Sequence, residues 1–210
     1  TDYKINVNVQ DRAELCFPQL LNSSCRKPAL PWTKAVLLNI LLSFISVMTV
    51  SLNLLVIISV SHFRQLHTPT NILLLSLAVS DLLVGLLLMP GEILRNTACW
   101  FLGDAICVLY SYLVCQIVSA SIGNIILISA DRYEAICHPL HYSSRFTVGR
   151  IKFSACLCWL GAALYGIIYV KDELVEPGRS KSCTGECTFC SRVKGGPDVL
   201  LPFPPRYIYL

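Results

Sequence analysis

The chain has 210 residues, of which 54% are hydrophobic and only 14% are charged, and its formal net charge is +4 at pH 7. A soluble domain carries about a quarter charged residues; here the charges gather between long uncharged stretches, which is typical of a protein with several membrane spans. The positive charges do not form one basic block, which excludes the footprint of a nucleic-acid-binding protein.

Four stretches are apolar and long enough to cross a bilayer, which needs roughly 20 apolar residues per helix. Because lipid cannot hydrogen bond to the backbone, each stretch is predicted to be a helix. The predicted helices cover about 34–61, 70–90, 104–133 and 151–171. The sequence therefore predicts an all-α integral membrane bundle, preceded by an N-terminal segment at 1–33.

Basic residues collect in the first and third connecting loops, whereas the second loop balances one basic residue against two acidic ones. The positive-inside rule places the first and third loops in the cytoplasm. The N-terminal segment, the second loop and the loop at 172–190 are then extracellular. An N-glycosylation sequon at Asn22 agrees with this orientation. We expect a multi-pass plasma-membrane protein with an extracellular N-terminus.

The end of the chain does not continue this pattern. Residues 191–210 form an atypical tail, in which four prolines stand among apolar residues and exclude a fifth span. The chain starts at Thr1 without an initiator Met or a signal peptide, so Thr1 is either a mature start or the edge of an incomplete gene model. We favour the second interpretation.

Eleven cysteines divide between the two sides of the membrane. Those expected outside, where thiols are oxidised, are Cys16, Cys25, Cys99, Cys107, Cys183, Cys187 and Cys190. An odd number cannot all pair within one chain. The favoured bridge joins Cys107, at the outer end of the third helix, to the loop after the fourth. The alternative is a set of scattered free thiols.

Asp81 stands in the middle of the second predicted helix. A carboxylate there costs roughly 2.5–3.5 kcal/mol on insertion scales, so it should face the bundle interior and find polar partners. Asn53 on the first helix and Ser121 on the third are the candidates, and a sodium ion or a proton would neutralise the charge. The alternative is a carboxylate that is merely tolerated.

The third helix ends with Asp131, Arg132 and Tyr133 at its cytoplasmic end. Adjacent opposite charges there can form an ion pair whose opening frees a guanidinium for a partner. On charge grounds alone, such a pair is also ordinary chemistry for a helix end.

Nothing in the sequence indicates an enzyme. The four histidines lie in loops expected to be cytoplasmic, and no cysteine or carboxylate set completes a metal site around them. No glycine-rich phosphate loop is present. We expect no catalytic residue, no metal site and no cofactor apart from a structural sodium ion.

A series of motifs occurs in order, each in the appropriate helix or loop, and resembles the first four helices of a rhodopsin-class G protein-coupled receptor. The motifs are Ser51-Leu-Asn53, Leu77-Ala-Val-Ser-Asp81, Trp100-Phe-Leu-Gly103, Cys107, Ser119-Ala-Ser121, Asp131-Arg-Tyr133, His138-Pro-Leu140 and Trp159. The fold that the resemblance implies is therefore four helices of a seven-helix bundle.

Within that class the chain is most similar to trace amine-associated receptors. The similarity rests on the segments Ser61-His-Phe-Arg-Gln-Leu-His-Thr-Pro-Thr-Asn71, Asp131-Arg-Tyr-Glu-Ala-Ile-Cys-His-Pro-Leu-His-Tyr142 and Cys183-Thr-Gly-Glu-Cys187. The resemblance implies that Cys107 pairs with Cys187, and that either Cys16 or Cys25 pairs with Cys183.

The same resemblance implies a ligand pocket at Val114, Cys115 and Val118, and a small amine as the ligand. Amine receptors usually carry an aspartate where this chain has Val114, which cannot pair with an ammonium group. Fish-type members look similar here, and the resemblance then places the acidic partner on a fifth helix. The implied mechanism is amine binding at the outer mouth, relay through Asp81 and Ser121, and release of Arg132 to a heterotrimeric G protein. An odorant-amine role is what the family suggests.

Three interpretations remain open. The first is an amine receptor whose chain is truncated after its fourth helix and, as written, cannot signal alone. The second is a four-helix membrane organiser such as a tetraspanin, which would place both termini in the cytoplasm. The third is a non-signalling variant that dimerises with full-length receptors and retains them in the cell.

Overall fold

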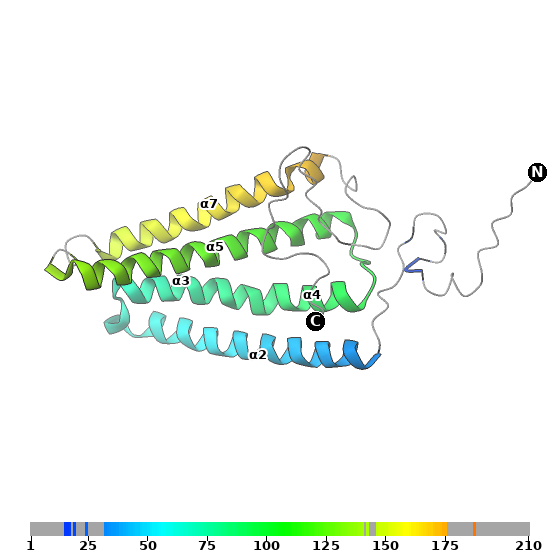
Figure 1. Ribbon diagram of the computed structural model, residues 1–210, viewed down its shortest axis with the longest axis horizontal. Helices are drawn as coiled ribbons and strands as arrows, with labels where there is room; N and C mark the ends of the chain where they lie inside the picture. Colours follow the sequence, from blue (N-terminus) through cyan, green and yellow to red (C-terminus); the bar gives the residue numbers. More distant parts are fainter. Residues whose placement is uncertain are drawn as a thin grey trace, which may run out of the picture.

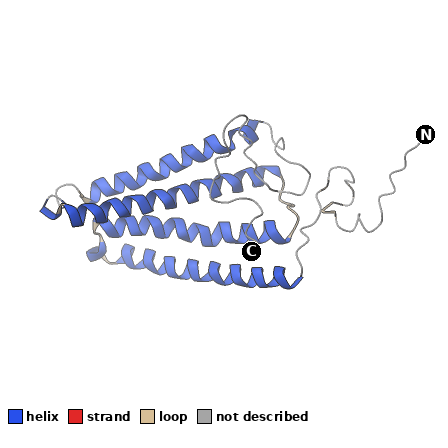
Figure 2. Ribbon diagram, in the orientation of Figure 1, coloured by secondary structure: helices blue, strands red, loops and turns tan. Residues whose placement is uncertain are grey.

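The computed structural model describes residues 15–17, 19, 24, 32–140, 142, 146–175 and 187. Every element in this part of the chain is helical, which confirms the predicted all-α class (Figures 1 and 2). The elements are α2 (Trp32–His62), η1 (Arg64–Leu66), α3 (Pro69–Leu83), η2 (Val84–Leu88), α4 (Met89–Thr97), α5 (Asp104–Cys137) and α7 (Val148–Val175).

Four helical stretches are long and apolar enough to cross a membrane, and they confirm the four predicted spans. They cover Thr33–His62, Pro69–Arg95, Asp104–Cys137 and Val148–Lys171. Two of them run further than the sequence predicts: the second continues beyond residue 90, and the third beyond residue 133. Most of the loop at 172–190 and the whole tail at 191–210 lie outside the described residues.

A π-helical turn allows the second span to continue beyond its predicted end at residue 90. The sequence predicts this span to cover 70–90. Pro90 has no N–H to donate to the carbonyl of the preceding turn, so an ordinary α-helix would lose a hydrogen bond there. The residues just before the proline instead form the π-helical turn η2, and α4 continues from it with Pro90 in its first turn. Local π adjustments of this kind let membrane helices accommodate proline. The extension adds Glu92 and Arg95 to the helical bundle.

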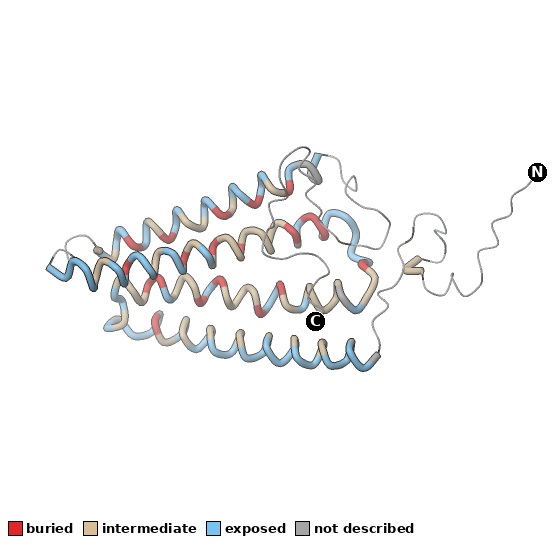
Figure 3. Tube along the Cα trace, viewed as in Figure 1, coloured by how far each residue is buried: buried red, intermediate tan, exposed pale blue. Residues whose placement is uncertain are grey.

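Helix α5 lies between α3 and α7, and α2 packs against α3 at the edge of the bundle (Figure 1). Figure 3 shows that the buried positions of α3, α5 and α7 follow the faces that these helices turn toward one another, while α2 is mostly exposed. Large apolar side chains such as Leu37 and Phe44 are therefore exposed on α2. In a membrane these side chains contact lipid hydrocarbon, which is as apolar as they are.

Four residues on one face of α5 are fully buried. Ile117, Ala120, Asn124 and Asp131 are all at most 1% exposed, and their spacing of three, four and seven residues places them on one helix face. Two of the four are polar. Buried polar groups require hydrogen-bond partners, so this face determines where the polar networks of the bundle form.

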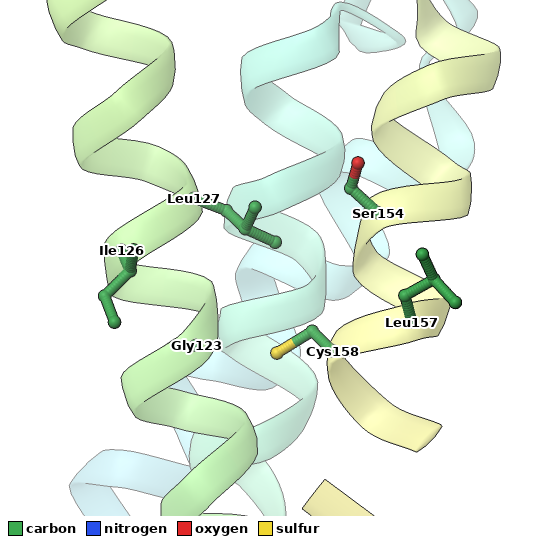
Figure 4. A pocket seen from close by; sticks show the side chains of 6 residues that line it. All are labelled: Gly123, Ile126, Leu127, Ser154, Leu157 and Cys158. Atoms are coloured by element: carbon green, nitrogen blue, oxygen red, sulfur yellow. The ribbon is translucent and has the colours of Figure 1, made fainter. Parts of the chain in front are cut away.

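Helices α5 and α7 approach closely at Gly123. A side chain at this position would overlap the sulfur of Cys158, and Cys158 Sγ donates to the carbonyl of Ala120 at 3.7 Å. Figure 4 shows the apolar groove that results between the two helices; its lining residues are Gly123, Ile126, Leu127, Ser154, Leu157 and Cys158.

Candidate functional sites

Asp131 is the centre of a polar network at one end of α5. Thr70 Oγ1, from the first turn of α3, donates to Asp131 Oδ2 at 2.7 Å, and Tyr142 Oη donates to Oδ1 at 2.7 Å. An Arg132 guanidinium nitrogen lies 3.3 Å from Oδ2. The carboxylate is fully buried and therefore needs compensation for its charge. Two hydroxyl donors and one cation supply it.

Arg132 and Tyr133 are placed differently from their neighbour. The Arg132 side chain is 55% exposed, although one of its nitrogens lies next to a fully buried carboxylate. Tyr133 is also exposed and makes an edge contact with the ring of His138. The arrangement therefore presents a cation at the surface whose counter-ion is fixed inside the bundle.

Tyr142 connects the segment after α5 to this network. Burial, and then the hydrogen bond and charge of Asp131, raise the pKa of the Tyr142 hydroxyl, while Thr70 and Arg132 act in the opposite direction. The hydroxyl therefore stays protonated and can donate throughout the neutral pH range. The ring stacks on Phe146, with centroids 5.3 Å apart. Neither Thr70 nor Tyr142 was predicted as a site residue.

A second network joins three helices at the level of Asn124. Trp159 Nε1 of α7 donates to Ser76 Oγ of α3 at 3.0 Å, and Ser76 Oγ donates to Asn124 Oδ1 of α5 at 2.9 Å. Asn124 is fully buried, and its Nδ2 has no partner among the described residues. Neither Ser76 nor Asn124 was predicted as a site residue. Both are polar residues inside otherwise apolar spans. The reasoning applied to Asp81, that such a residue needs polar partners, could have identified them.

The structure does not join Asp81 to its predicted partners. Asn53 Nδ2 donates to the carbonyl of Thr49 at 2.9 Å, and Ser121 Oγ donates to that of Ile117 at 3.0 Å. Each donor is therefore used by its own helix, one turn earlier, which short polar side chains commonly do. Within the described part of the chain, no hydrogen bond links Asp81 to either residue. The polar or sodium site predicted at Asn53, Asp81 and Ser121 therefore has no direct hydrogen bond between Asp81 and the other two residues, and it stays a prediction.

The predicted pocket residues Val114, Cys115 and Val118 are half-buried on α5. One turn before Val114, Tyr110 carries a polar cluster that was not predicted. Tyr110 Oη lies 3.0 Å from Glu92 Oε1 and 3.1 Å from the carbonyl of Leu88, and it can donate to either. Glu92 Oε2 accepts from Arg95 at 2.7 Å. Because the second helix was predicted to end at residue 90, Glu92 was expected only as a charge in the loop that follows.

Among the residues that the structure describes, two disulfides lie at the end of the bundle opposite Asp131. Cys107 is bonded to Cys187, the pairing that the resemblance implied. Cys16 is bonded to Cys99, so the expectation that Cys16 could pair with Cys183 is wrong. Cys99 directly precedes Trp100 in the loop between α4 and α5, and this loop lies at the end of the bundle where α2 begins (Figure 1). Cys25, Cys183 and Asn22 lie outside the described residues.

Comparison with known proteins places these features in a family. Residues 52–194 match the family described as 7 transmembrane receptor (rhodopsin family). The chain therefore belongs to this family of membrane receptors. Because its relatives are receptors, the expectation that the chain is not an enzyme is confirmed.

Trace amine-associated receptors are among its curated relatives. The chain is 38% identical to trace amine-associated receptor 13c of Danio rerio over 184 residues, which is 85% of this chain and 54% of that receptor. It is 38% identical to receptor 5 of Rattus norvegicus, covering 83% and 53%, and 36% identical to receptor 3 of Mus musculus, covering 74% and 46%. The chain thus spans about half the length of these relatives.

Proposed function

We propose that this chain belongs to a receptor that senses small amines at the disulfide-bearing end of the bundle and activates a G protein at the Arg132 end. The names of its relatives support amines as the ligand class. The observation that carries the transducing role is the half-exposed Arg132 beside the fully buried Asp131. A cation that is held by a buried partner can be released to an incoming acceptor when the helices rearrange.

The experiment that tests this role substitutes Arg132→Ala in the complete gene product expressed in cells. Amine-evoked cAMP should fall to the background level, while amine binding to membranes from the same cells should be unchanged. Lys152→Ala, an exposed cation on α7, is the matched control and should leave both measurements intact. An Arg132→Ala receptor that still raises cAMP would sink the assignment.

We also propose that the receptor lies in the plasma membrane with its N-terminus outside. The two described disulfides support this orientation because disulfides require an oxidising compartment. Both lie at the end of the bundle where α2 begins. Cys137, at the other end of α5, is free. Glycosidase treatment of the cell-surface protein should increase its gel mobility, and Asn22→Gln should abolish that change. A wild-type protein whose mobility does not change would count against the orientation.

A sodium ion near Asp81 is a further part of the proposal. Its support is chemical: a half-buried carboxylate lies inside a membrane span, and carboxylate and hydroxyl oxygens are suitable ligands for a hard cation. Asp81 would supply the charge. Ser121 Oγ keeps its lone pairs available as an acceptor while its proton is donated to Ile117.

A further inference from the structure

We propose that Glu92 is the counter-ion for the ammonium group of the ligand, and that the ammonium takes the place of Arg95 on its carboxylate. This inference rests on the proposed amine-sensing function and names the residue within this chain that performs it. An ammonium group that leaves water for a binding site needs an anion, and Val114 cannot supply one. Glu92 then takes the role that the resemblance gives to an acidic residue on a fifth helix.

The position of Tyr110 links Glu92 to the face of α5 that carries Val114. Residues four apart on a helix lie above one another, about 6 Å apart along the axis, so Tyr110 stands one turn outside Val114 on the same face. The Tyr110 hydroxyl lies 3.0 Å from Glu92 Oε1. The Glu92 carboxylate therefore contacts the tip of a side chain that is based one turn from Val114.

The surroundings of Tyr110 hold its ring in this place. The ring packs against a buried cluster formed by Trp100 and the disulfide of Cys107 and Cys187. Gly91 also lies against the ring, because a side chain at residue 91 would overlap it. A ring confined by these neighbours fixes its hydroxyl and so positions one oxygen of Glu92.

The second oxygen of Glu92 is held in a way that permits exchange. Glu92 Oε2 bonds to Arg95, three residues later on the same helix, and the two side chains are 33% and 29% exposed. An ion pair that is this open to solvent is weakly stabilising. The ammonium can displace the flexible guanidinium while Tyr110 keeps its contact with Oε1. One cation leaves as another arrives, so the carboxylate is never left without a counter-charge.

Asp104 is a second carboxylate at this end of the bundle, and it does not have this setting. Asp104 is exposed in the first turn of α5, whereas Glu92 is half-buried against Tyr110. Asp104 is therefore a matched control: it has the same charge, lies at the same end of the bundle and is away from the Tyr110 face.

The test measures amine binding to membranes from cells that express the complete gene product. The probes are isoamylamine, 2-phenylethylamine and cadaverine, each compared with its matching alcohol or diol as a neutral control. Glu92→Gln should weaken amine binding by about tenfold or more, since a hydrogen-bonded charge pair is lost. Arg95→Gln should strengthen it, because the competing cation is removed. Asp104→Asn should change nothing, and the alcohols should not bind.

The opposite effects of the two variants separate this role from a structural one. An ion pair that only stabilises the helix would make Glu92→Gln and Arg95→Gln weaken binding alike, and that result would overturn the inference. Amine binding that survives Glu92→Gln would overturn it as well and would leave amine sensing intact. If no amine binds to the wild-type receptor, the proposed function fails together with this inference.

Discussion

Asp131 shows how one buried residue can organise the end of a bundle. Its carboxylate accepts from Thr70 and Tyr142, which lie 61 residues before it and 11 residues after it in the chain. A fully buried charge is tolerated because these donors and Arg132 surround it. The sequence predicted the pairing of Asp131 and Arg132, because they are adjacent. Neither hydroxyl could be predicted, since both reach Asp131 only through the packing of separate segments.

The polar site predicted around Asp81 shows no direct hydrogen bond from Asp81 to Asn53 or Ser121. The cost of a carboxylate in lipid predicted that it would need compensation, and that reasoning still holds. Asn53 and Ser121 were named because they are polar and at a suitable depth. Both donate to carbonyls of their own helices instead. Depth alone cannot show whether a short polar side chain points across the bundle or back to its own backbone.

The proposed sodium ion leads to a prediction at Asp81. If the ion binds there, amine affinity should differ between sodium chloride and choline chloride at equal ionic strength. Asp81→Asn removes the charge that holds the ion and should make the two affinities equal. Glu134→Gln is the control, because it removes a carboxylate near the C-terminal end of α5. It should leave the difference in amine affinity between the two salts unchanged. An Asp81→Asn receptor that still responds to sodium would contradict the site.

At the scale of the elements, the sequence predicted the helices better than their ends. Apolar length identified all four spans, but the second apolar stretch ends at residue 90, whereas the helix continues through the π turn before Pro90. The error mattered because Glu92 and Arg95 lie in the extension. The Cys16–Cys99 bridge was missed for a related reason: pairing depends on which loops meet at the end of the bundle, and cysteine spacing does not contain that information.

The close approach of α5 and α7 gives a prediction about stability. Gly123→Val would place a branched side chain against the sulfur of Cys158 and push the two helices apart. Overpacking of this kind costs about 1–3 kcal/mol. We expect a lower unfolding temperature for the detergent-solubilised receptor and less receptor at the cell surface.

Gly161→Val is the control for this substitution. Gly161 lies on α7 with nothing within 4 Å of where its side chain would stand. The same glycine-to-valine change there should be nearly neutral. Equal effects of the two substitutions would show that helix propensity, and not the contact between α5 and α7, determines the outcome.

At the scale of the whole molecule, the chain contains two polar ends joined by α5. One end carries both disulfides and the Glu92, Tyr110 and Arg95 cluster, and the other carries the Asp131 and Arg132 pair. The Ser76, Asn124 and Trp159 network lies between them and links α3, α5 and α7. A rearrangement of these helices at one end can therefore alter the other end. The motif order in the sequence predicted the helical bundle and its Asp131 and Arg132 end but neither of the other two networks, and the family match confirms the fold class.

The central claim is that the receptor converts amine binding at one end into G protein activation at the other. Its most direct test is cAMP accumulation in cells that express the complete gene product, measured against increasing concentrations of isoamylamine, 2-phenylethylamine and cadaverine. The account predicts a saturable rise for at least one amine, no rise for the matching alcohols or diol, and no rise in cells without the receptor. Amines that bind to the receptor without changing cAMP or any other G protein output would contradict it.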